Sequence, residues 1–218
     1  RLSWRIESNE QNVIQTAYHI LVASTPELLE QGKGDIWDSG KIESDASQWI
    51  AYQGKTLKRN APYYWKVKID TNKGTTDWST PAFWTTGLFN EADWQGQWIG
   101  LDKAAPGDSE TQWSRLAARY LRKEFALKKE VKRATVHIAG MGLYELFING
   151  QRIGNQVLAP APTDYRKTIL YNTYDVTSLL QTENAIGVTL GNGRFYTMRQ
   201  NYKPYKIPTF GYPKLRLN

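Results

Sequence analysis

The segment from Gly191 to Tyr205 holds the side chains best suited to bind a polar ligand. Its planar groups include Asn192 and Arg194, and its aromatic groups include Tyr196 and Tyr202. Planar amide and guanidinium groups bridge neighbouring hydroxyls of a sugar, and aromatic rings pack on its C–H faces. The same residue types also gather at protein interfaces. The segment therefore predicts either a carbohydrate-binding loop or a surface that packs against another domain.

A second candidate lies earlier in the chain, where Asp164 and Tyr165 follow Pro162 and Thr163. A carboxylate next to an aromatic ring can bind a sugar, and it can equally serve a structural contact. Both interpretations stay open, with the structural one favoured.

The other motifs predict turns or core positions. The two histidines, His19 and His137, lie far apart in alternating patterns, so neither a metal site nor a Ser–His pair can be built from them. Three short motifs are incomplete. Asp38–Gly40 lacks the full spacing of a nucleophile elbow, Gly32–Asp35 that of a phosphate loop, and Gly140–Gly142 that of a dinucleotide fingerprint. Cysteine is absent, which excludes thiolate chemistry and disulfides. No catalytic residue, metal or cofactor is expected.

The formal charge of +7 comes from 28 basic and 21 acidic residues, and all of the excess lies after Gly87. A basic group that could contact nucleic acid comprises Arg119, Arg122, Lys123, Lys128, Lys129, Lys132 and Arg133. Stacking aromatics are not interleaved with it, so a solvated face or a face that docks on an acidic domain is expected instead. No apolar run approaches the roughly 20 residues that a membrane helix needs.

Short alternating strands must position these side chains. Nine Trp and 13 Tyr in 218 residues favour β-sheet, where aromatics fill the pleated surface. The clearest strand is 61–69, which predicts Tyr63, Trp65, Val67 and Ile69 inward and Tyr64, Lys66, Lys68 and Asp70 toward water. One short helix is predicted after Thr25, because Pro26 suits the first helical position and Gly32 ends the pattern.

The second half repeats the alternation. Asn149-Gly150 between two apolar runs predicts a tight hairpin, since both turn positions need positive φ. One capped helical turn is expected within 175–180, and the strand 214–218 has no turn after it, which predicts an incomplete last sheet. The change in charge and the bridging segment 88–100 predict two domains, 1–87 and 88–218.

Leu57 followed by Tyr63 resembles the leucine and tyrosine-corner pattern of fibronectin type III modules. A wider set of motifs resembles the N-terminal region of bacterial α-L-rhamnosidases over nearly the whole chain. The matching stretches include Trp37–Gly40, Tyr63–Val67, Trp94–Ile99, Gly142–Glu145, Ile148–Gly150, Thr163–Tyr165 and Gly191–Tyr196. Any β-sandwich would explain the corner alone, whereas the order of the motifs is specific.

The resemblance implies an all-β fold of two consecutive β-sandwiches: a fibronectin type III-like sandwich over 1–87, then a jelly roll over 88–218 that is truncated at its C-terminal end. That family hydrolyses terminal α-L-rhamnosides with inversion, and its catalytic acids lie in an α-helical toroid further along the chain. The implied partners are this downstream catalytic domain and a rhamnose-containing glycan, and the implied location is the periplasm or the exterior. Two alternatives remain: a free-standing carbohydrate-binding module, and the sugar-binding domain of another glycoside hydrolase.

Overall fold

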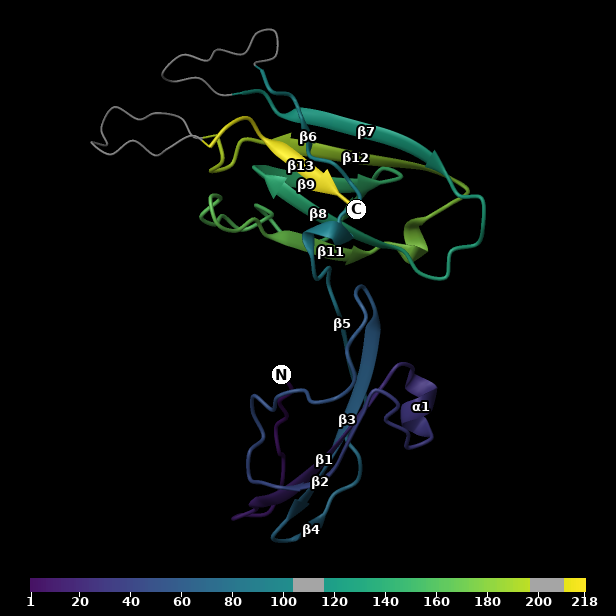
Figure 1. The fold of residues 1–218 in the computed structure, drawn as a ribbon, viewed down its shortest axis with the longest axis vertical. Helices are drawn as coiled ribbons and strands as arrows, with labels where there is room; N and C mark the ends of the chain where they lie inside the picture. Colours follow the sequence, from purple (N-terminus) through teal and green to yellow (C-terminus); the bar gives the residue numbers. More distant parts are fainter. Residues whose placement is uncertain (104–115, 197–209) are drawn as a thin grey trace, which may run out of the picture. The chain divides into compact units, whose positions relative to one another are not determined.

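The computed structural model describes residues 1–103, 116–196 and 210–218. The chain divides into two compact units, residues 1–89 (unit 1) and 90–218 (unit 2) (Figure 1). The described regular structure is nearly all antiparallel β-strand, which confirms the predicted fold class. None of the helices in the described ranges is long and apolar enough to cross a membrane.

Unit 1 contains one five-stranded sheet. Its strands are β1 (Gln15–Ala23), β2 (Trp37–Glu43), β3 (Pro62–Thr71), β4 (Gly74–Thr75) and β5 (Ala82–Thr85). The order is β2-β1-β3-β4, and β5 also pairs with β3. Because Ile20 lies opposite Val67 in the ladder, the alternate residues of β1 and β3 share one face.

That face carries the core of unit 1. Ile20, Val22 and Val67 are buried there, under extended chain on either side of a bridge between Leu2 and Ile50. The second layer of unit 1 is therefore largely irregular extended chain.

A tyrosine corner closes this core. The hydroxyl of Tyr63 accepts a hydrogen bond of 2.6 Å from the Lys58 amide, and Leu57 packs against the same cluster. The pattern predicted from Leu57 and Tyr63 is confirmed.

Tyr63→Phe is expected to lower the free energy of unfolding of unit 1 by about 1 kcal/mol, because the Lys58 amide loses its partner while the ring stays packed. Urea denaturation followed by tryptophan fluorescence measures the change. Tyr120→Phe is the control, since Tyr120 is 82% exposed and should change nothing. Equal effects of the two substitutions would contradict the corner's role.

The opposite face of the sheet is covered by a short helix, α1 (Pro26–Glu30), capped by Thr25 as predicted. Lys66, expected to face water, is only 9% exposed. Its ammonium donates 2.5 Å to the Leu29 carbonyl and lies 5.0 Å from the centre of the Trp78 ring. The prediction for Lys66 was wrong because strand periodicity assigns a residue to a face but does not show what covers that face.

Unit 2 contains two four-stranded sheets. One has the order β10-β9-β12-β7 and the other β11-β8-β13-β6. The strands are β6 (Ile99–Gly100), β7 (Arg119–Ala126), β8 (Thr135–Met141), β9 (Leu143–Ile148), β10 (Gln151–Ile153), β11 (Tyr171–Asp175), β12 (Glu183–Gly191) and β13 (Lys214–Leu217). Short 3-10 turns, η1 (Glu91–Asp93) and η2 (Thr177–Leu179), precede β6 and β12.

The core of unit 2 lies between these sheets, where Ile138, Leu146, Ile148, Leu190 and Leu215 are almost fully buried. The hairpin predicted at Asn149-Gly150 is confirmed: both residues have positive φ, and Ile148 pairs with Gln151 across the turn.

Strand β13 lies between β8 and β6. Its Arg216 attaches residues 91–96, which precede β6, to the sheet. Arg216 is only 8% exposed. Its guanidinium contacts the Glu91 carboxylate and donates to the carbonyls of Trp94 (3.2 Å) and Gly96 (2.6 Å). One buried cation thus holds residues 91–96 against β13.

His137 on β8 is 1% exposed. Its Nδ1 lies 2.9 Å from the Thr173 hydroxyl, and its Nε2 has no hydrogen-bond partner within the described part of unit 2. Burial, with a smaller contribution from the Arg133 charge, lowers the pKa of this imidazole. The structural role expected for His137 therefore fits a neutral core histidine.

This burial predicts a pH effect. Below about pH 6.5, the ordinary histidine value, the unfolded chain takes up a proton that folded His137 resists, so the free energy of unfolding should fall as the pH falls. His137→Asn should be less stable at pH 7.5 and should show a flatter decline to pH 5, measured by urea denaturation. An unchanged decline would contradict this origin.

Candidate functional site

An aromatic cluster at one end of unit 2 brings together two of the segments singled out in the sequence. The ring of Tyr165 lies edge-on to Phe195 (5.2 Å between centroids) and to Phe210 (5.4 Å), and Phe195 stacks on Phe210 at 5.9 Å. The Phe210 amide also donates to the Phe195 carbonyl at 2.9 Å. Tyr165 is thus fixed by neighbouring rings rather than left free.

The loop after β12 presents its side chains in different directions. Asn192 donates 3.1 Å to the Leu116 carbonyl, and its backbone carbonyl accepts from the Tyr196 amide. The Asn192 side-chain oxygen is buried and has no partner among the described atoms. Arg194 is exposed. Burial raises the pKa of Tyr165, and the positive charge of Arg194 partly opposes this rise. Tyr196 stacks on Tyr212 at 5.9 Å. The predicted site residue Tyr202 lies outside the described residues.

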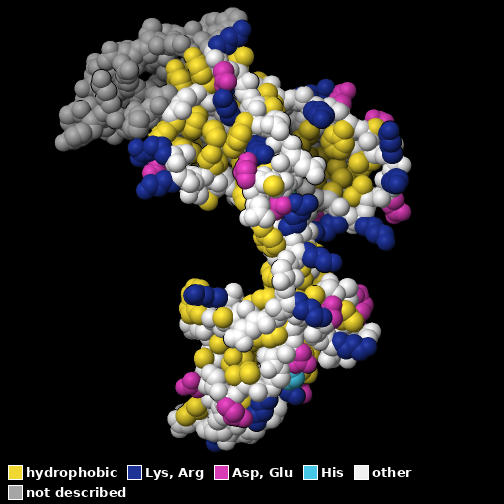
Figure 2. Space-filling model, in the orientation of Figure 1, with side chains coloured by type: hydrophobic (Ala, Val, Ile, Leu, Met, Phe, Trp, Pro, Cys, Tyr) yellow, Lys and Arg dark blue, Asp and Glu magenta, His cyan; other side chains and the backbone are white. Residues whose placement is uncertain are grey.

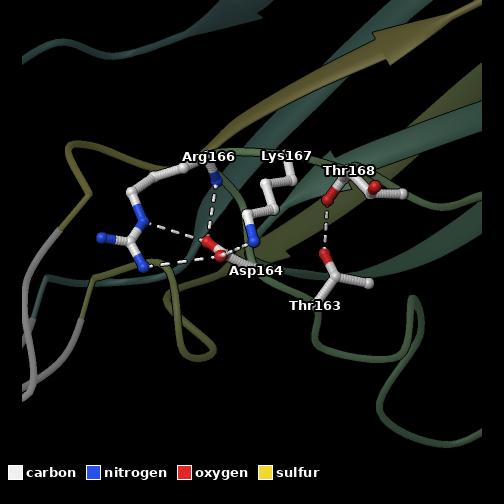
Figure 3. A network of polar contacts seen from close by, with 5 residues as sticks. All are labelled: Thr163, Asp164, Arg166, Lys167 and Thr168. Carbon is white, nitrogen blue, oxygen red and sulfur yellow. Dashed lines mark hydrogen bonds and ion pairs between the residues drawn. The ribbon is translucent and has the colours of Figure 1, made fainter.

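Asp164 organises the turn that carries Tyr165 (Figure 3). Its carboxylate accepts 3.0 Å from Arg166 Nε, and the Thr163 hydroxyl donates 2.5 Å to the Thr168 carbonyl. The hydrogen bonds from Arg166 lower the pKa of Asp164. Asp164 therefore holds the local turn.

A surface hollow of about 590 Å³ adjoins the aromatic cluster, with Phe195 and Phe210 in its wall. Its polar side is formed by Lys214, whose ammonium lies 2.9 Å from the Asp102 carboxylate, and Trp98 and Tyr212 add aromatic surface. Sequence reasoning missed these wall residues as ligand candidates. The available signal was Trp98 within the 94–99 motif, but 97 or more residues separate Trp98 from Phe195, Phe210 and Lys214 in the wall.

The described carboxyl groups show pKa shifts in one direction only. A general acid at neutral pH needs a raised carboxyl pKa. Five described carboxyl groups have a lowered pKa instead, each through hydrogen bonds: Glu27, Asp38, Asp70, Asp164 and Asp175. Among the residues that the structure describes, no group of three or more His, Asp or Glu side chains could hold a metal ion.

Two protein families match separate parts of the chain. Residues 1–90 match the family described as the Rha78A-like, N-terminal immunoglobulin domain. Residues 129–218 match the α-L-rhamnosidase N-terminal domain. The first description names an immunoglobulin domain where the sequence resembled a fibronectin module, and both are sandwich architectures that can carry a tyrosine corner.

Individual relatives extend this likeness over nearly the whole chain. An α-L-rhamnosidase of Formosa agariphila is 40% identical over 217 residues, which cover 92% of this chain and 23% of that protein. An α-L-rhamnosidase of an Alteromonas species is 36% identical over 197 residues, or 88% of this chain and 21% of that protein. The chain therefore spans about a quarter of the length of these relatives.

Solved structures agree. The α-L-rhamnosidase of Dictyoglumus thermophilum matches with a TM-score of 0.84 and 38% identity, and that of Aspergillus terreus with 0.81 and 31%. Each match covers 99% of this chain and 24% of the other. The chain therefore corresponds to the N-terminal region of α-L-rhamnosidases, whose two N-terminal domains match residues 1–90 and 129–218.

Proposed function

We propose that this chain is the accessory region of an enzyme that hydrolyses terminal α-L-rhamnosides with inversion. Its two β domains would support the catalytic domain and shape the approach of a rhamnose-containing glycan. The observation that carries the proposal is the match to about a quarter of several α-L-rhamnosidases.

The pKa of Asp164 supports a role for this chain outside the catalytic step. Inverting hydrolysis needs one carboxylic acid to protonate the leaving oxygen and a second carboxylate to activate water, about 6.5–9.5 Å apart. Asp164, the one carboxylate near the aromatic cluster that the sequence singled out, has a lowered pKa and is bound by Arg166. It is suited to hold a turn and unsuited to donate a proton.

The aromatic cluster and Arg194 supply a surface for contact with the catalytic domain. Rings fixed by one another, next to an exposed guanidinium, give a rigid patch that orders little on association. This patch would fix the position of the accessory region against the catalytic domain.

A chimera tests the proposal. This chain replaces the matching region of the Formosa agariphila relative, and hydrolysis of an aryl α-L-rhamnoside is followed with NMR of the first-formed anomer. Activity with release of the β anomer is expected, and Arg194→Ala should lower it several-fold while Arg5→Ala, at an exposed site in unit 1, should not. Activity of the isolated chain, abolished by changing one of its own carboxylates, would overturn the proposal.

A second candidate function is independent sugar binding, favoured by the hollow beside Trp98 and Tyr212 with its Asp102–Lys214 ion pair. Titration of the isolated chain with L-rhamnose and rhamnosylated glycans separates the two. Saturable binding that Trp98→Ala removes would establish the carbohydrate-binding module.

A further inference from the structure

In the part of unit 2 that the structure describes, the two sheets leave their shared core open along one side. Strand β7 ends one sheet and β6 ends the other. Between them lies a cleft of about 350 Å³ whose apolar wall comes from Ile99, Leu121, Ile186, Val188, Leu215 and Leu217. In Figure 2, hydrophobic side chains are visible in the region of β7 and β12, with lysine and arginine beside them.

The backbone at this opening is available for pairing. β7 pairs with β12 along one edge over eight residues, and no strand in the described ranges pairs with its other edge. β6 has two residues, and among the described strands it pairs only with β13. An edge of this length beside an apolar cleft is a template for an added strand.

Lys123 indicates the charge of that strand. Lys123 lies directly opposite Ile186, and Leu121 opposite Val188, so the lysine shares the core-facing side of β7. It is exposed at the mouth of the cleft, and no ion pair to it occurs within the described ranges. A carboxylate on an incoming strand would meet this cation next to the apolar wall.

We infer that the cleft is completed by a β-strand from the remainder of an α-L-rhamnosidase chain, with alternating apolar residues and a carboxylate placed against Lys123. The inference rests on the proposed function, because the relatives are about four times the length matched here. Apolar residues of the strand would cover Leu121 and Leu217, and its backbone would pair with β7. Two copies of this chain fit less well, since a second β7 would bring another lysine rather than an acid.

Overlapping 15-residue peptides that cover the unmatched part of the Formosa agariphila relative are the probe. A peptide with alternating apolar residues and a carboxylate should bind the whole chain and slow hydrogen exchange of the β7 amides. Lys123→Glu should weaken that binding at least tenfold, and a peptide with lysine in place of its carboxylate should recover it. Lys132→Glu makes the same charge change on an exposed residue outside the cleft and should leave affinity within twofold.

Circular dichroism and thermal unfolding show whether each variant is folded, and Lys123 is exposed enough for the fold to tolerate the change. Absence of any peptide that protects β7, or binding indifferent to Lys123→Glu, would overturn the inference. So would concentration-dependent dimers with protected β7 amides, seen by sedimentation velocity, because the occupant would then be a second copy. An active chimera together with such a result would leave the proposed function standing.

Discussion

Gly142→Ala is expected to lower the free energy of unfolding of unit 2 by about 4 kcal/mol. Gly142 separates β8 from β9 with φ at +132°, a conformation that residues with a Cβ rarely adopt. An added Cβ would also overlap the Gly191 carbonyl oxygen and lie 3.3 Å from Pro213 Cβ. Strain and overlap therefore act together, and urea denaturation measures their sum.

Gly150→Ala separates the two causes. Gly150 has φ at +81°, but a Cβ there would meet no atom within 4 Å. Only the left-handed strain remains, which costs about 1–2 kcal/mol. If both variants lost the same stability, the close approach at Gly142 would have no energetic consequence and the prediction would fail.

Arg216→Met should cost unit 2 about 3 kcal/mol. The substitution keeps much of the apolar length of the side chain but removes the donors to the Trp94 and Gly96 carbonyls and the contact with Glu91. It also removes the guanidinium that lies 5.2 Å from the centre of the Trp94 ring. Denaturation gives the loss, and faster hydrogen exchange in residues 91–98 would locate it.

Lys214→Met provides the comparison on the same strand. Lys214 pairs with Asp102 at 2.9 Å, but Lys214 is partly exposed and Asp102 is exposed, so the loss of this pair should cost only about 0.5 kcal/mol. If Arg216→Met and Lys214→Met lowered the free energy of unfolding equally, burial of Arg216 would not strengthen its contacts, and the prediction would be wrong.

The strands could be predicted because their signals are local. Alternation of apolar residues located β1, β3, β9 and β12, and the Asn149-Gly150 turn depends only on two positive φ angles. The tyrosine corner likewise joins Tyr63 to an amide only five residues away. Signals within a few residues are fixed by backbone geometry, so the sequence alone carries them.

The candidate site could be predicted only in part. Tyr165 and the Gly191–Tyr196 loop were identified from residue types, and the structure places Tyr165 against Phe195. Phe210, which completes the cluster, and Trp98, which borders it, had no signal linking them to that loop. Pairing between segments this distant depends on strand order, which residue types do not encode locally.

The sequence by itself determined the β fold, the tight turns and the tyrosine corner, because each follows from neighbours along the chain. Only the tertiary structure decided that Lys66 and Arg216 are buried and that Lys123 lines a cleft between β6 and β7. A side chain's environment depends on which elements cover its face of the sheet, and those elements come from up to 125 residues away, as in the contact of Arg216 with Glu91.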